Sequence, residues 1–142
     1  MAAKRYDPIP VDPTYGGIYA HGVELPSTSR VVLVSGQVGV APDGVLADDF
    51  EAQFIQSIEN VKAVLEAAEM TLRDVMKLGI FLIRRRDIPI AVDVRKRYFN
   101  GVRPAITTVL TSGLVSPDWL VEVEAIAAKQ SVDHLPPRGR WV

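Results

Sequence analysis

Apolar and polar residues alternate along the last strand-like run of the chain, residues 120–128. Because strand side chains point to opposite faces in turn, the Val and Ala residues at odd positions 121–127 share one face and Glu122 and Glu124 share the other. Two carboxylates on one sheet face indicate either a solvent-exposed surface or a cleft that uses one carboxylate for binding or proton transfer.

Four more apolar runs predict strands, at residues 18–23, 30–35, 77–83 and 105–111. The first two are separated by a turn-like segment rich in Pro, Ser and Thr, so we expect them to pair as a hairpin. The opening residues 1–16 are rich in proline and predict an extended arm, with regular structure starting near Ile18.

Two segments have the spacing of amphipathic helices. In the first, Phe54, Ile58, Val61 and Leu65 recur at steps of four and three, which predicts a helix of about five turns that begins after Asp49. Thr71 then fits the N-cap of a short turn. The second helix is expected over residues 88–99, with Pro89 in its first turn.

The predicted order is strand, strand, helix, strand, helix, strand, strand. It indicates an α+β fold in which a mixed sheet carries two helices on one face, as one domain over residues 1–142 with an irregular tail from residue 130. The runs 31–34 and 78–83 are apolar on both faces, so the face without helices also needs cover. A closed homo-oligomer with facing sheets would provide it and would create clefts between subunits.

The composition of the chain limits the partners and cofactors that we expect. The 16 basic and 17 acidic residues nearly balance, which gives no reason to expect a nucleic-acid partner, and the dense run Arg84–Arg86 fits a solvated loop. There is no cysteine, and the two histidines lack a ligand-like spacing partner, so we expect neither a metal nor another cofactor. No run reaches the roughly 20 apolar residues of a membrane span, which predicts a cytoplasmic protein without a membrane partner.

Four strings in order carry a resemblance to a known family. They are Ser35-Gly36-Gln37-Val38, the helical segment 57–68, Arg103-Pro104-Ala105 and the strand segment 122–127. Over residues 17–129 the chain resembles the RidA/YjgF family of small imine and enamine deaminases. The resemblance implies a chorismate-mutase-like fold and a homotrimer with three small-molecule clefts at its subunit interfaces.

The resemblance also implies roles for individual residues. A glutamate on the last strand of active relatives helps to position the attacking water, and Glu122 occupies that position. An arginine after the Pro-Ala pair holds the substrate carboxylate, but here that position is Ile106, which cannot form the paired charge-assisted hydrogen bonds of a guanidinium. Arg103 lies three positions earlier, an odd offset that points it to the other strand face.

The remaining lining implied by the resemblance surrounds these two positions. It consists of Tyr19, Ser35 and Gly36, with Val92 at a position where relatives often carry asparagine and Thr108 beside Glu122. Each also has an ordinary structural explanation, such as a strand-end bulge at Gly36.

Three functions therefore remain open from the sequence. The first is a divergent deaminase for a small imine, enamine or related unsaturated metabolite that lacks the usual carboxylate contact. The second is a non-catalytic trimer that binds a small molecule. The third is an endoribonuclease or translation inhibitor, which the balanced charge supports least.

Overall fold

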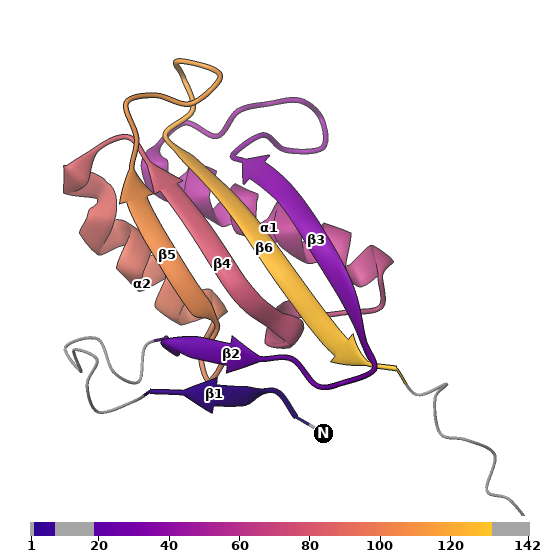
Figure 1. The fold of residues 1–142 in the computed structure, drawn as a ribbon. Coiled ribbons are helices and arrows are strands. Elements are labelled where there is room, and N and C mark those ends of the chain that lie inside the picture. Colours follow the sequence, from indigo (N-terminus) through magenta and orange to yellow (C-terminus); the bar gives the residue numbers. More distant parts are fainter. Residues whose placement is uncertain (1, 8–18, 132–142) are drawn as a thin grey trace, which may run out of the picture.

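A computed structural model of the chain describes residues 2–7 and 19–131. Its main feature is a four-stranded sheet with two helices on one face (Figure 1). The strands, in sheet order, are β3 (Ser29–Val38), β6 (Val121–Gln130), β4 (Val75–Leu82) and β5 (Ala105–Leu110), and the helices are α1 (Phe50–Ala67) and α2 (Ile88–Tyr98). Short 3₁₀ helices η2 (Leu72–Asp74) and η3 (Arg85–Asp87) precede β4 and α2.

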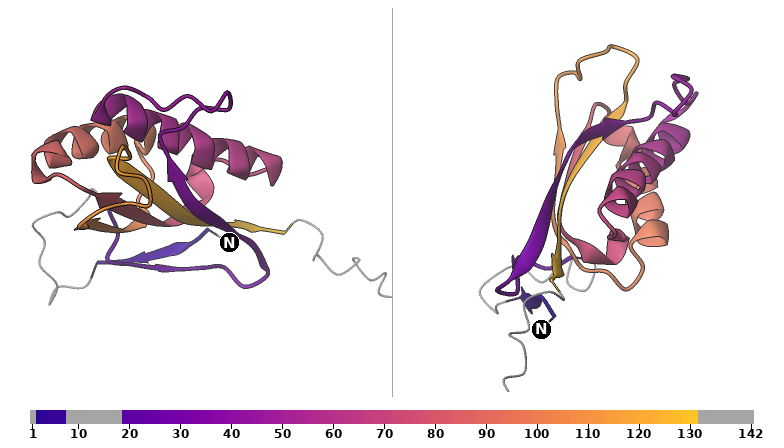
Figure 2. Two further views of the ribbon diagram at one scale, coloured as in Figure 1. Left: turned by 90° about the horizontal axis from the view of Figure 1, so that it is seen from above. Right: turned by 90° about the vertical axis from the view of Figure 1, so that its right-hand side faces the viewer.

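The sheet is mixed, as the sequence pattern predicts. β6 is antiparallel to both of its neighbours, β3 and β4, whereas β4 and β5 run parallel. Figure 2 shows both helices on the same side of the sheet, and within residues 2–7 and 19–131 no helix covers the other side. The expected two-layer α+β arrangement is confirmed.

The core fills the space between the helices and the sheet. Phe54, Ile58 and Leu65 of α1 are fully buried, as are Leu78 and Leu82 on the facing side of β4. Fully burying a side chain of this size contributes about 1.5–3 kcal/mol. The apolar stripe predicted from the steps of four and three is therefore the buried face of α1.

Local signals set the ends of these elements. The carboxylate of Asp49 accepts a hydrogen bond from the Ala52 amide at 2.8 Å and caps α1. Thr71 and Asp74 form a capping box at η2, which confirms the expected turn. Pro89 lies in the first turn of α2, as expected.

The predicted hairpin between residues 18–23 and 30–35 is wrong. β2 (Gly22–Glu24) pairs instead with β1 (Lys4–Tyr6), and the two form a separate small sheet (Figure 1). β3 pairs with β6. Both strands have ten residues, so this pair forms more backbone hydrogen bonds than β3 could form with the three-residue β2.

Regular structure therefore starts at Lys4 and not near Ile18. Residues 8–16 of the expected arm and residues 132–142 of the expected tail lie outside the described ranges. At the other end of the chain, β6 continues two residues beyond the predicted end at residue 128.

A buried glutamine positions the start of β6. Gln53 on α1 is almost fully buried, and its Oε1 accepts a hydrogen bond from the Leu120 amide at 2.9 Å. Its Nε2 donates to the carbonyls of Ala47 and Asp118 at 3.2 Å each. The Gln53 side chain thus hydrogen-bonds to the loop before α1 and to the loop that leads into β6, directly ahead of Glu122.

The face of the sheet without helices, here called the open face, is apolar toward its β3 edge. Val31, Leu33 and Ile126 are 49%, 74% and 36% exposed. Clustered apolar side chains with this exposure are typical of interaction surfaces.

Candidate functional site

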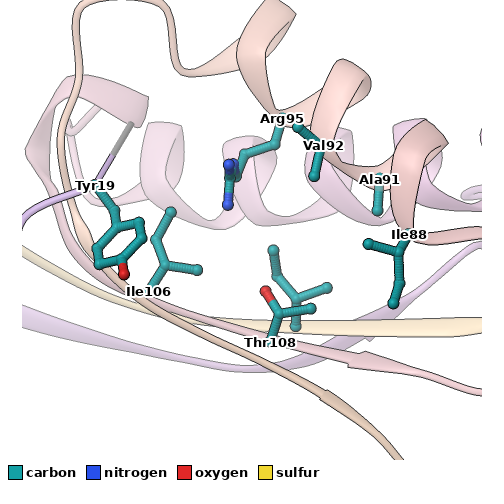
Figure 3. A pocket seen from close by; sticks show the side chains of 8 residues that line it. Tyr19, Ile88, Ala91, Val92, Arg95, Ile106 and Thr108 are labelled. Atoms are coloured by element: carbon teal, nitrogen blue, oxygen red, sulfur yellow. The ribbon is translucent and has the colours of Figure 1, made fainter. Parts of the chain in front are cut away.

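A cavity of about 350 Å³ lies between α2 and the β4–β5 edge of the sheet. It is lined by Tyr19, Ile80, Ile88, Ala91, Val92, Arg95, Ile106 and Thr108 (Figure 3). Four of the residues that the sequence singled out are thus brought together: Tyr19, Val92, Ile106 and Thr108.

The register of β5 explains which of its residues reach the cavity. Ile106 pairs with Leu78 and Thr108 pairs with Ile80, so both β5 side chains share the helix-covered face with these β4 residues. The cavity is mostly apolar, and none of the described residues that line it is acidic.

Tyr19 is held at the cavity by contacts with the chain just before β5. The amide of Ala20 donates to the Pro104 carbonyl at 3.1 Å, and Nη2 of Arg103 donates to the Tyr19 carbonyl at 3.2 Å. The same Arg103 nitrogen forms an ion pair with Asp7. Arg103 is therefore engaged in positioning Tyr19 and Asp7, consistent with the expectation that it does not replace the arginine missing at residue 106.

Sequence reasoning missed Arg95. It lies on α2 three residues after Val92, and Figure 3 shows its guanidinium group reaching from the helix toward the space between Ile106 and Thr108. Burial against the cavity wall lowers the pKa of the Arg95 guanidinium, and the nearby Tyr19 opposes this shift. The spacing of Arg95 from Val92 was the one signal in the sequence, because helix positions three apart lie on one face.

Glu122 lies on the other face of the sheet. In β6 it is flanked by buried Val121 and Val123, and its register partners are Val38 on β3 and Phe81 on β4. Within one subunit Glu122 is consequently not beside Thr108 or Ile106, which face the helices.

Gly36 lies directly against Glu122. The pairing of β3 with β6 shifts between Val34 and Gln37, so Ser35 and Gly36 form a bulge in the strand. A Cβ atom added at Gly36 would lie 1.9 Å from Oε1 of Glu122, so a larger residue at this position would displace the carboxylate. Ser35 is exposed beside it, and its carbonyl accepts a hydrogen bond from the Gln37 side chain at 3.1 Å.

The residues from the sequence interpretation thus form two groups. Tyr19, Val92, Ile106 and Thr108 line the cavity on the helix-covered face. Ser35, Gly36 and Glu122 surround the bulge, with Glu122 on the open face. Apolar surface and a cation lie on one side of the sheet, and a carboxylate that could orient water lies on the other.

The described part of the chain contains neither a cluster of metal ligands nor a membrane-spanning helix. Within residues 2–7 and 19–131, no three His, Asp or Glu side chains gather into a set that could bind a metal ion. Neither α1 nor α2 has the length and apolar character needed to cross a membrane.

Comparison with known proteins decides the family. A family model described as Endoribonuclease L-PSP matches residues 11–129. A 2-iminobutanoate/2-iminopropanoate deaminase from Salmonella typhimurium is 36% identical over 118 residues, which cover 80% of this chain and 89% of that protein. The chain belongs to the RidA/YjgF family.

Other members of the RidA/YjgF family agree with this assignment. A 2-iminobutanoate/2-iminopropanoate deaminase from Dermatophagoides farinae is 33% identical, with 89% of this chain and 97% of that protein covered. Among solved structures, the Rid family protein YyfB from Yersinia pestis superimposes with a TM-score of 0.80 at 25% identity, covering 91% of this chain and 100% of that one. Escherichia coli TdcF with bound serine gives a TM-score of 0.67 at 33% identity, with 79% and 88% covered.

Proposed function

We propose that this RidA/YjgF protein hydrolyses a small imine, or the enamine in equilibrium with it, to a carbonyl compound and ammonia. The observation that carries the proposal is the division of its site residues between the two faces of the sheet, in a chain whose relatives include 2-iminobutanoate/2-iminopropanoate deaminases. The cavity on the helix-covered face binds the substrate, and the carboxylate of Glu122 supplies the polar group for water.

A second subunit brings these groups together in this proposal. The exposed Val31, Leu33 and Ile126 support an oligomer in which the open faces meet, and we propose the closed homotrimer typical of the family. Glu122 of one subunit then reaches the cavity mouth of its neighbour. Each trimer has three such clefts.

The reaction needs one proton acceptor and no cofactor. Glu122 orients a water molecule and takes its proton as the water oxygen forms a bond to the imine carbon. Glu122 then gives this proton to the former imine nitrogen, which yields a neutral carbinolamine and restores the carboxylate. The hydroxyl proton of the carbinolamine moves to its nitrogen, the C–N bond breaks, and ammonia leaves as the C=O bond forms, so atoms and charge balance.

The exposed basic run does not favour the nuclease alternative. Arg84 forms an ion pair with the buried Asp87 at 2.6 Å, immediately before α2. This contact has a structural role at η3, and the formal net charge of the chain is −1. Binding of a small molecule without turnover uses the same cavity and remains the second candidate.

The test is ammonia release from a panel of imines generated in solution, with Glu122→Gln and Glu124→Gln as a matched pair. Gln keeps the shape of the side chain but cannot take up a proton as a carboxylate does, so the Glu122 variant should lose roughly 100- to 10,000-fold in kcat. Glu124 lies over Gly79 on the same open face and has no role in the proposed step, so its variant should stay within a few-fold of the native protein.

The two candidate functions give different results in this assay. Native turnover that disappears in the Glu122 variant supports the deaminase. Turnover that survives in the Glu122 variant contradicts the role of Glu122. Tight binding of panel compounds without any ammonia release would favour the non-catalytic binder.

A further inference from the structure

Arg95 differs from the other half-buried arginines of the chain in the contacts of its side chain. Arg5 donates to the Arg103 carbonyl, Arg84 pairs with Asp87, and Arg103 pairs with Asp7. Among residues 2–7 and 19–131, no hydrogen-bond acceptor or carboxylate pairs with the guanidinium of Arg95. Its neighbour Arg97 is exposed and forms ion pairs with Glu51 and Asp93.

The surroundings of Arg95 make an unpaired cation costly. Its side chain lies among Ile80, Ile88, Val92 and Ile106 in the cavity wall. Removing a cation from water carries a free-energy cost unless an anion or hydrogen-bond acceptors replace the lost hydration. Guanidinium keeps its proton in proteins, so the charge cannot be relieved by neutralisation. An anion that enters the cavity would restore the missing contacts.

The electrostatic environment around the cavity also favours an anion. A second cavity of about 380 Å³ adjoins the first, shares Arg95 and Ile106 with it, and is lined as well by Lys96 and Arg103. Among the described residues, no acidic side chain lines either cavity. Lys96 therefore adds a second positive charge beside Arg95, whereas the charge of Arg103 is already paired with Asp7.

We propose that Arg95 binds the carboxylate of the substrate from helix α2, so that this protein acts on carboxylates with an apolar body. The proposal deepens the proposed function and rests on it for the identity of the reacting group. With Ile106 the β5 wall of the cavity is apolar. The residue that binds the substrate carboxylate is then Arg95, on α2 at the opposite wall. The planar guanidinium offers two parallel donors to a carboxylate, a geometry that lysine cannot provide.

The cavity walls also limit the rest of the ligand. Ile80, Ile88, Ala91 and Val92 present only carbon atoms from their side chains, and Tyr19 adds an aromatic ring. A branched aliphatic or aromatic body attached to the carboxylate would bury its surface against these groups. A small polar body would leave this apolar surface in contact with water.

Calorimetric binding of stable product-like compounds tests the proposal without relying on turnover. The probes are 4-methyl-2-oxopentanoate, its neutral primary amide and inorganic phosphate, each titrated into the native protein. We expect the carboxylate to bind at least about 10-fold more tightly than the amide, because only the carboxylate pairs with a guanidinium. Equal binding of acid and amide by the native protein would overturn the proposal, as would tighter binding of phosphate.

Variants then assign the effect to Arg95. Arg95→Met should weaken carboxylate binding about 10- to 100-fold and leave amide binding unchanged. The carboxylate affinity of Arg95→Lys should lie between that of Arg95→Met and that of the native protein. Arg97→Met removes the same charge two residues away and should bind the carboxylate as the native protein does. If Arg95→Met does not fold, Arg95→Lys and the comparison of acid with amide still decide the outcome.

Failure of this inference is distinguishable from failure of the proposed function. Carboxylate binding that depends on Arg95, in a protein that hydrolyses no imine, would contradict the deaminase and leave the binding site standing. Imine hydrolysis with the same kcat/KM in the native protein and in Arg95→Met would support the deaminase and refute the role of Arg95.

Discussion

The two faces of the four-stranded sheet carry different groups that the proposed mechanism uses. The helix-covered face holds a cavity with apolar walls and a cation, Arg95, and no acidic residue of the described part of the chain lines it. The open face holds the carboxylate of Glu122 beside the bulge at Gly36. Because a strand sends alternate side chains to opposite faces, one subunit cannot direct Glu122 into its own cavity. In the proposed mechanism, substrate binding and proton transfer are therefore separated within one subunit, and a contact between subunits is needed to bring them together.

The largest effect that tests this comparison is expected at Gly36. In Gly36→Ala the new Cβ would meet Oε1 of Glu122 at 1.9 Å, so the carboxylate must move. The end of a flexible side chain can yield at little cost in stability, but the position of the base is lost. We expect kcat to fall at least about 100-fold with the melting temperature nearly unchanged.

Gly79→Ala is the matched control on the same open face. There the added Cβ would lie 2.7 Å from Cγ of Glu124, so it displaces a carboxylate that the mechanism does not use. Its kcat should remain close to native. A Gly36→Ala protein that retains full kcat would show that the position of Glu122 is not critical.

A smaller effect is expected from the cavity side of the sheet. Thr108 is one of the few polar groups in the cavity lining, and Figure 3 shows its hydroxyl oxygen near the space that Arg95 approaches. Thr108→Val removes one neutral hydrogen bond to the ligand, so kcat/KM should fall about 2- to 10-fold. Thr108→Ser keeps the hydroxyl and should remain near native. Equal losses in both variants would indicate a packing role for the Thr108 methyl group.

The smallest effect concerns the contact that holds Tyr19 at the cavity. The amide of His21 and the guanidinium of Arg103 donate to the carboxylate of Asp7 and hold its pKa below the usual range. A lowered pKa in the folded state means that this contact stabilises the fold at neutral pH and is lost as the pH falls through the folded-state pKa. The contact should therefore persist at pH 5 and weaken below about pH 4.

Amide hydrogen exchange at His21 measures this change. Exchange should accelerate in acid relative to the core amides of β6, and Asp7→Asn should show less dependence on pH over the same range. Identical profiles for the native protein and the variant would exclude Asp7 as the titrating group.

Much of the fold could be predicted from periodic patterns. The positions of Phe54, Ile58 and Leu65 locate the buried face of α1, and the alternation around Glu122 gives the two faces of β6. The pairing of the short strands could not be predicted, because β1 and β2 have only three residues each and so carry little pattern that could fix a register.

The site was only partly accessible from the sequence. Similarity in strand motifs brought forward Ile106, Thr108 and Glu122, but Arg95 matches no motif and is one of several arginines in the chain. Its importance follows from its half-buried position in an apolar wall, which depends on how α2 rotates over β5. The separation of Glu122 from Ile106 likewise needed the register of three strands.

Mixing two variants tests most directly the claim that two subunits share each site. Glu122→Gln and Arg95→Met proteins are unfolded together, refolded at equal concentrations and assayed for imine hydrolysis at low substrate concentration, with mixed oligomers verified by native mass spectrometry. If each cleft takes Glu122 from one subunit and Arg95 from its neighbour, random assembly restores about a quarter of the clefts, and activity should rise well above the sum of the separate variants. Mixed oligomers whose activity does not exceed that sum would contradict the shared site.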